Sequence, residues 1–156
     1  MSNQFIIPQV MPIWAQSIGG FIINFGSSEF LAYRWILSIK GESAGLKLGK
    51  KPISDKIKII KKSLPGHSIS EGKKARVEKL FDEIASFVIL RNRIAHNPLC
   101  FLPRESTGEM VLSPIDLKTM HPSKGGKVIG ITHQEIAKAA LRVNVINREL
   151  AAFLDA

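Results

Sequence analysis

An arginine, an asparagine and a histidine stand close together in a short stretch that runs from Leu90 to Pro98. They are Arg91, Asn92 and His96. Histidine titrates near neutral pH and can act as a general base or a general acid. The guanidinium of arginine offers a charged fork to the oxygens of a phosphate. Residues of these types could cleave RNA through its own 2′-hydroxyl, without a metal ion.

The spacing of apolar residues predicts the helix that carries this stretch. Ser70 is a suitable N-cap, and Pro98 ends the helix because proline has no N–H to donate. The predicted helix therefore runs from about Ser70 to His96. Its inward face recurs every three or four residues. The apolar positions on it are Val77, Leu80, Phe81, Ile84, Phe87 and Val88. Arg91 and Ala95 continue that face, so an arginine stands where a leucine would be expected.

Helix geometry separates the arginine from the histidine. At about 3.6 residues per turn, Arg91 and His96 lie about 140° apart, whereas Asn92 and His96 share a face. One helix alone is therefore not expected to bring the first two together, and a homodimer with two facing helices is expected instead. The alternative is structural: the arginine pairs with a carboxylate, and the histidine stabilises the C-terminal end of the helix.

An arginine, a polar residue, three further residues and a histidine form a pattern that resembles the motif of the HEPN superfamily. Here it is Arg91-Asn92-Arg93-Ile94-Ala95-His96. Beyond the motif, the resemblance is architectural and has no residue-level matches. Many members of the superfamily are metal-independent endoribonucleases of phage defence, toxin–antitoxin pairs and RNA processing. The resemblance implies catalysis by Arg91 and His96 with support from Asn92, no cofactor, RNA as the substrate, and an antitoxin or regulatory protein as a further partner.

Positive charge is concentrated in one part of the chain. The whole sequence has a formal net charge of +9, and residues 40–79 hold twelve Lys or Arg against four Asp or Glu, a net +8. Such a segment suits a phosphate backbone or an acidic partner. Lys58, Lys61 and Lys62, together with Arg93, are therefore the predicted RNA-binding residues. The equally open alternative is a solvated helix surface.

The remaining patterns predict an all-α fold, an up-and-down bundle of about four helices in one HEPN-like domain over residues 1–156. Residues 1–12 form an arm, and helices follow at 13–39 and 55–64, the second capped by Ser54 with Lys56 facing outward. Residues 40–52 connect these two helices. Residues 99–131 form an irregular or small β-hairpin insertion. Thr132 and Glu135 make a capping box for the last helix.

The composition also argues against several classes of protein. The four histidines and the single cysteine, Cys100, show neither HExxH nor CxxC spacing, so no metal site is predicted. No role is assigned to His67, His121 or His133. The apolar N-terminal stretch has no basic residue before Arg34 and is interrupted by prolines and polar residues, so we expect neither a signal peptide nor a membrane span. A cytoplasmic protein is expected.

The pattern thus favours a metal-independent RNA endonuclease that acts as a toxin or phage-defence effector. Two alternatives remain open. One is a non-catalytic HEPN-type module that binds RNA, nucleotide or a protein partner. The other is a structural dimerisation bundle without chemistry. If Arg91 and His96 lie in an open site, catalysis gains support, whereas burial of both against carboxylates favours the structural alternative.

Overall fold

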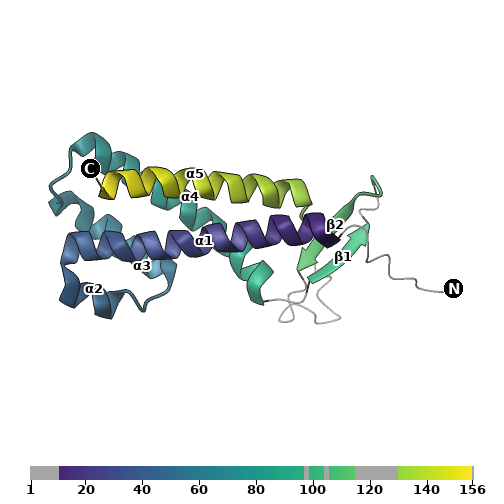
Figure 1. Ribbon diagram of the computed structural model, residues 1–156, viewed down its shortest axis with the longest axis horizontal. Coiled ribbons are helices and arrows are strands. Elements are labelled where there is room, and N and C mark those ends of the chain that lie inside the picture. The colour runs from purple at the N-terminus through teal and green to yellow at the C-terminus, as the bar shows by residue number, and fades with distance from the viewer. Residues whose placement is uncertain (1–10, 97–98, 104–105, 115–129, 156) are drawn as a thin grey trace. The chain divides into compact units, whose positions relative to one another are not determined.

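The computed structural model describes residues 11–96, 99–103, 106–114 and 130–155 (Figure 1). Within these residues there are five α-helices, one 3-10 turn and two strands. They are α1 (Met11–Lys40), α2 (Glu42–Leu48), α3 (Ile53–Ser63), η1 (Leu64–Gly66), α4 (Glu71–His96), β1 (Leu99–Pro103), β2 (Met110–Pro114) and α5 (His133–Leu154). The predicted all-α fold class is confirmed. No described helix has both the length and the apolar character that a membrane crossing requires.

The chain folds into two compact units, which we name by their content. The hairpin unit comprises residues 1–22 and 90–141, and the helical unit comprises residues 23–89 and 142–156. The Arg91 motif belongs to the hairpin unit. The lysines of α3 belong to the helical unit.

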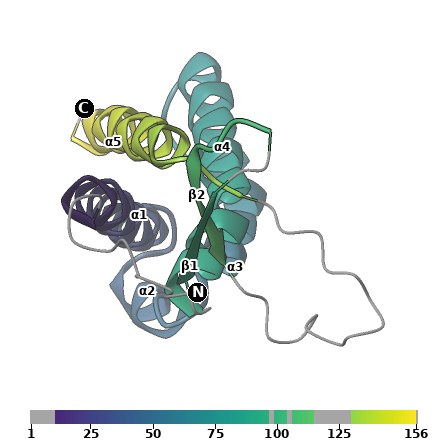
Figure 2. The ribbon, with the colours of Figure 1, turned by 90° about the vertical axis from the view of Figure 1, so that its right-hand side faces the viewer.

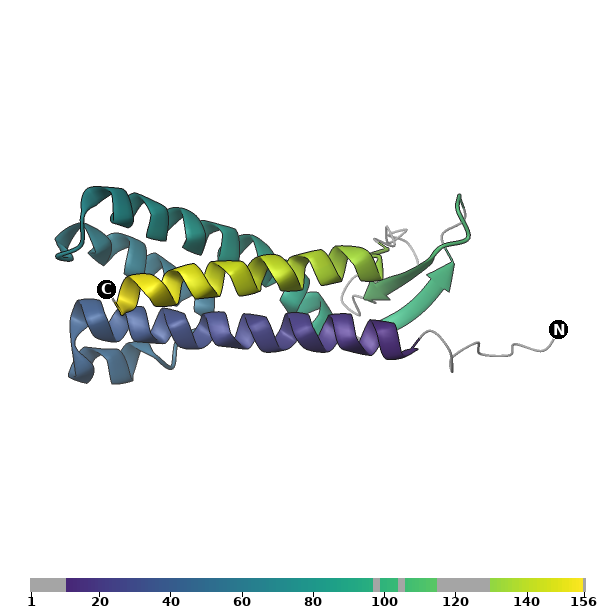
Figure 3. The ribbon, with the colours of Figure 1, turned by 45° about the horizontal axis from the view of Figure 1, so that its top comes forward.

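Apolar side chains from four helices fill the core of the helical unit. Trp35 is at its centre, with its ring edge-on to Phe81 at 6.4 Å between centroids. The indole Nε1 donates to the carbonyl of Leu150 at 3.3 Å, which joins α1 to α5. Figure 3 shows the ribbons of these two helices side by side in the helical unit. Further buried members are Phe25, Ile36, Ile57, Ile60, Val77, Leu80, Ile84, Val143 and Ile146. The inward face predicted for residues 70–96 therefore packs in this core at Leu80, Phe81 and Ile84, whereas Phe87 and Val88 are half-buried.

A small polar network crosses the same core between α1 and α5. Ser28, which is fully buried, donates its hydroxyl to Oδ1 of Asn147 at 2.6 Å. The amide of Asn147 donates in turn to the backbone carbonyl of Asn24 at 2.8 Å. Polar groups removed from water need such partners, so this network fixes how the two helices align in the helical unit.

Two arginine–glutamate pairs join α4 to α5. Arg76 donates to both carboxylate oxygens of Glu149, at 2.6 and 2.7 Å. Arg142 donates from Nε to Glu83 at 2.8 Å. The hydrogen bond from Arg76 holds the pKa of Glu149 below its ordinary value, although burial acts in the opposite direction. The ionised form of Glu149 is therefore favoured by folding.

Acid should weaken the helical unit through Glu149. Its pKa is lowered by folding from an unfolded value of about 4.3, so its contribution is present above that value and is lost as the pH falls through the folded pKa. We expect Glu149→Gln to lower the free energy of unfolding at pH 7 and to have a smaller effect at pH 3. Urea unfolding at both pH values measures this. An equal difference at both would contradict the role of the Glu149 carboxylate.

The start of the chain and the predicted connection differ from expectation. Helix α1 begins at Met11, so Pro12 lies in the first helical turn, where proline is tolerated. Residues 1–10 of the predicted arm lie outside the described residues. The predicted connection 40–52 contains α2, which follows a break at Gly41 with a φ of +78°. Glycine adopts this φ readily, and it allows a new helix to start directly after α1.

The short lysine-rich helix also differs in two details. Helix α3 begins at Ile53 with Pro52 at the N-cap position, so the predicted Ser54 cap is wrong. Lys56 is buried, with only 8% of its surface exposed, so its predicted outward orientation is wrong too. It shares a helix face with Ile53 and Ile60 at spacings of three and four residues, and that face packs inward.

The insertion contains a short antiparallel hairpin, as predicted (Figure 2). Phe101 of β1 pairs with Leu112 of β2, and Leu112 also exchanges backbone hydrogen bonds with Ile131 at 2.8 and 2.9 Å. Trp14 of α1 is buried beside this hairpin, with its ring 5.2 Å from that of Phe101. Residues 115–129 and the side chain of Cys100 lie outside the described residues. The hairpin thus packs on the first turns of α1 in the hairpin unit.

The predicted capping box at the start of α5 is confirmed. The backbone N–H of Thr132 donates to the Glu135 carboxylate at 2.7 Å, and the N–H of Glu135 donates to the Thr132 hydroxyl at 3.1 Å. Two N–H groups that the helix itself cannot satisfy are paired in this way. Helix α5 therefore begins at His133 without unpaired donors at these two positions.

Candidate functional site

Helix α4 positions the candidate site at its C-terminal end. The helix begins after Ser70, whose hydroxyl accepts the backbone N–H of Lys73 at 3.4 Å, so the predicted cap is confirmed. In the last turns Ile94 is buried, with 6% of its surface exposed, whereas Ala95 is exposed. The prediction that Ala95 continues the inward face is therefore wrong. The buried anchor of the last turn is Ile94.

The three motif residues meet at this end of the helix. Nη1 of Arg91 donates to Oδ1 of Asn92 at 3.0 Å, and the same nitrogen lies 3.2 Å from Nε2 of His96. Arg91 is half-buried, and Asn92 and His96 are exposed. The structure thus brings together a guanidinium, an amide and an imidazole within one chain.

This contact contradicts the expectation that one helix could not join Arg91 to His96. The angle around the helix axis describes Cα positions, and long side chains can span it. In an α-helix every Cα–Cβ bond tilts toward the N-terminus, so the imidazole of His96 leans back toward the preceding turn. The flexible arginine stem reaches forward to meet it. A homodimer is therefore not needed to assemble the pair.

The contact also assigns the donor and the acceptor. A guanidinium can only donate hydrogen bonds, so Nε2 of His96 must offer its lone pair to Arg91. As the acceptor of this hydrogen bond, Nε2 has a lone pair directed at the position that Arg91 now occupies. If the arginine turned toward a phosphate, that lone pair would become accessible.

The exposure of the cluster bears on the structural alternative. In a purely structural pair, both residues would be buried, since buried charges need partners. His96 is instead exposed, and Arg91 is only half-buried. His96 is also the last residue of α4, where the helix dipole favours positive charge. This position is also the one that the helix-capping alternative requires.

The predicted RNA-binding residues have different surroundings. Lys61 of α3 donates to both oxygens of Asp82, at 2.7 and 2.9 Å, and lies 3.5 Å from Glu78. The hydrogen bond to Asp82 raises the pKa of Lys61, and burial lowers it by less. Lys58 lies 3.6 Å from Asp55. A phosphate would have to compete with these carboxylates.

Lys62 and Arg93 complete the predicted set. Lys62 is exposed on α3, and within the described part of the chain it has no ion pair. Arg93 is half-buried in the last turn of α4, in the hairpin unit with the Arg91 cluster. Of the three lysines, Lys62 is therefore the best placed to meet a polyanion.

Comparison of the chain with protein-family models, curated proteins and solved structures finds no match. Among the described residues, His, Cys, Asp and Glu side chains do not gather in groups of three or more that could hold a metal ion. The inference about function therefore depends on the geometry of Arg91, Asn92 and His96.

Proposed function

We propose that this chain is a metal-independent endoribonuclease of HEPN type, with Arg91 and His96 as catalytic residues and Asn92 as an orienting residue. One observation carries the proposal. A guanidinium and the basic nitrogen of an imidazole lie 3.2 Å apart on an exposed helix end. These are the two groups that phosphodiester cleavage through the 2′-hydroxyl needs, a phosphate clamp and a proton acceptor.

The proposed reaction begins when Arg91 turns its fork from His96 to the scissile phosphate. Nε2 of His96 then takes the proton of the 2′-hydroxyl, and the 2′-oxygen attacks phosphorus. The bond from phosphorus to the 5′-oxygen breaks, and that oxygen takes a proton from an imidazolium or from water. The products are a 2′,3′-cyclic phosphate and a 5′-hydroxyl. Asn92 holds the guanidinium before substrate arrives, through the 3.0 Å hydrogen bond.

We also propose a homodimer. Its role would be to exclude water from the site, because one chain already joins Arg91 to His96. Hydrogen bonds and charges stabilise a transition state best where water is excluded, and Asn92 and His96 are exposed in the single chain. A second copy that covers the site would exclude water and could supply its own His96 as the acid. Sedimentation equilibrium at micromolar concentration tests this. A strict monomer that still cleaves RNA would remove the dimer from the proposal.

The proposed cellular role rests on the resemblance to the HEPN motif. We propose that the enzyme acts in the cytoplasm as a toxin or phage-defence effector, held inactive by an antitoxin or regulatory protein. Its basic character supports an RNA substrate, since a net charge of +9 favours polyanions. Growth of cells that express the intact chain, compared with a His96→Ala variant, tests the role.

Incubation of purified protein with structured and unstructured RNA in excess EDTA tests the activity. The expected result is cleavage that persists in EDTA and leaves 2′,3′-cyclic phosphate ends. Binding without cleavage would instead favour the non-catalytic module. If RNA is neither bound nor cleaved, the proposal fails.

Lys62 should contribute to RNA affinity without contributing to sequence preference. Each phosphate contact adds about 0.7 to the log–log salt slope for a single strand, so Lys62→Gln should reduce the slope by about that amount. Binding should weaken equally for different RNA sequences. Fluorescence anisotropy at several salt concentrations measures this.

A matched control for Lys62 is Lys47→Gln, which removes an exposed lysine of α2. If the two variants lower the slope equally, Lys62 has no special place on the RNA path. An unchanged slope in Lys62→Gln would mean that this lysine is only solvated surface. We avoid Lys61 in this test because its loss would also remove the ion pairs to Asp82 and Glu78.

A further inference from the structure

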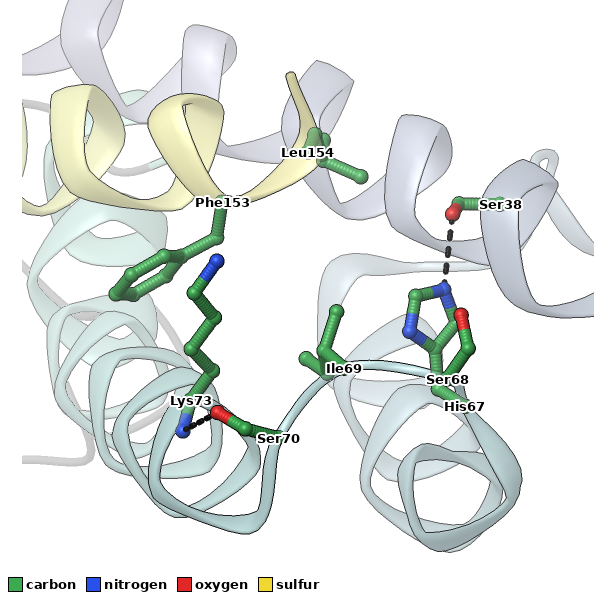
Figure 4. A pocket seen from close by; sticks show the side chains of 8 residues that line it. All are labelled: Ser38, His67, Ser68, Ile69, Ser70, Lys73, Phe153 and Leu154. Carbon is green, nitrogen blue, oxygen red and sulfur yellow. Dashed lines mark hydrogen bonds between the residues drawn. The ribbon is translucent and has the colours of Figure 1, made fainter. Parts of the chain in front are cut away.

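A pocket of about 410 Å³ lies in the helical unit, at a place with no part in the proposed reaction (Figure 4). Four segments of the unit meet there: the end of α1, the turn before α4, the first turn of α4 and the end of α5. Its size falls within the range of pockets that hold small molecules. The sequence gives no signal for it, because Ser38, His67 and Phe153 are far apart along the chain.

Basic and hydroxyl-bearing side chains line one part of the pocket. They are His67, Lys73 and three serines, and none of the lining residues is acidic. The nearest carboxylates along the chain are engaged elsewhere. Glu71 accepts from Lys74 at 2.8 Å, and Asp155 accepts from Arg34 at 3.2 Å. The polar part of the pocket therefore favours an anion.

The other part of the pocket is apolar. Phe153, Leu154 and Ile69 form it, and the ammonium of Lys73 lies 6.0 Å from the centroid of the Phe153 ring. This contact holds a cation beside an aromatic surface. Figure 4 shows Lys73 and Phe153 side by side on one side of the pocket and His67 on the other. A ligand with both a charged group and an apolar ring would match both parts.

One ring nitrogen of His67 lacks a hydrogen-bond partner among the described residues. The Nε2 atom of the ring lies 3.1 Å from the Ser38 hydroxyl, while its Nδ1 is buried and has no hydrogen-bond partner in the described part of the chain. Whichever tautomer is present, one ring nitrogen stays unpaired. Buried polar atoms are nearly always paired in folded proteins, so an unpaired one calls for an explanation. A small turn of the ring toward a bound oxyanion would supply the partner.

We propose that this pocket binds a small organic anion. Its carboxylate or phosphate group contacts Lys73 and His67, and its ring or apolar part packs on Phe153 and Leu154. The charged group of such a ligand would gain charge-assisted hydrogen bonds, which are the strongest that a half-buried lysine can make. The pocket is independent of the ribonuclease site, so either proposal can fail alone.

Titration of the intact chain with phenyl phosphate and with benzoate, followed by nitrogen–proton correlation NMR, tests the proposal. Benzyl alcohol and inorganic phosphate serve as the ring without charge and the anion without a ring. We expect saturable shifts at the amides of Ser68 to Lys73 and at Phe153. At least one of phenyl phosphate and benzoate should bind more tightly than both benzyl alcohol and inorganic phosphate. If phenyl phosphate binds more tightly than benzoate, the pocket prefers a phosphate group, and the reverse order indicates a carboxylate.

The matched variants are Lys73→Gln and Lys79→Gln, the second of which removes an exposed lysine further along α4. Lys73→Gln should weaken binding of the aromatic anion about tenfold, as the loss of one charge-assisted hydrogen bond does. It should leave benzyl alcohol unaffected, and Lys79→Gln should change neither. Equal weakening in both variants, or shifts that do not saturate at the pocket, would overturn the proposal. The spectra also show whether each variant is folded.

Discussion

Replacement of His96 by alanine is expected to lower RNA cleavage by a factor of about 10² to 10⁴, the usual contribution of a general acid–base group. Arg91→Ala should lower it by a factor of about 10² to 10³, because one charged donor to the phosphate is lost. Both residues are at least partly open to solvent, so the fold should tolerate either change. Single-turnover cleavage rates with saturating enzyme measure both effects.

Two controls separate chemistry from charge and from folding. Arg91→Lys keeps the positive charge but loses the planar fork, so most of the activity should still be lost. Arg148→Ala removes an exposed arginine of α5 and should leave the rate unchanged. Circular dichroism establishes that each variant is folded. Full activity in a folded His96→Ala or Arg91→Ala protein would exclude the assignment of that residue.

The second large effect concerns stability. Asn147→Leu should reduce the free energy of unfolding by about 1–3 kcal/mol, because the buried hydroxyl of Ser28 loses its 2.6 Å acceptor and keeps only the Asn24 carbonyl at 3.3 Å. Ser28→Ala should have a cost of similar size, since Oδ1 of Asn147 then lacks its donor. Urea unfolding measures both. The double variant should cost less than the sum of the single variants, because it removes both polar partners together.

Two results would contradict this role of the hydrogen bond between Ser28 and Asn147. If the effects of Ser28→Ala and Asn147→Leu were additive, the 2.6 Å hydrogen bond would contribute nothing of its own. A stabilised Asn147→Leu protein would mean that apolar packing is preferable to the polar network at this position.

Much of the fold could be predicted because its signals are local. The apolar stripe of α4, the Ser70 cap and the Thr132–Glu135 capping box depend on residues a few positions apart. Local spacing places Lys56 on the inward face of α3, but its charge favours solvent, and only the depth of the core formed with other helices decides that it is buried. Helix α2 differs from the expected connection for a related reason, because its glycines favour a loop. Gly45 is instead buried against Leu37, where an added Cβ would lie 2.2 Å from Cδ2.

For the candidate site, too, the sequence predicts the local features and not the contacts between helices. Residue types and spacing were enough to select Arg91, Asn92 and His96 as a group. Ideal helix angles wrongly separated Arg91 from His96, because they ignore how far an arginine side chain reaches. The sequence could not predict the ion pairs of Lys61 either. Asp82 lies on another helix, and no spacing rule connects Lys61 with Asp82.

The charges that join α4 to α5 also favour the antiparallel direction of the two helices. Arg76 and Glu83 on α4 are seven residues apart, and so are Arg142 and Glu149 on α5. With antiparallel helices every contact is between opposite charges, as observed. Reversal of one helix would oppose Arg76 to Arg142 and Glu83 to Glu149. Partly exposed ion pairs stabilise the native fold modestly, and the same four charges would penalise the reversed arrangement of the two helices.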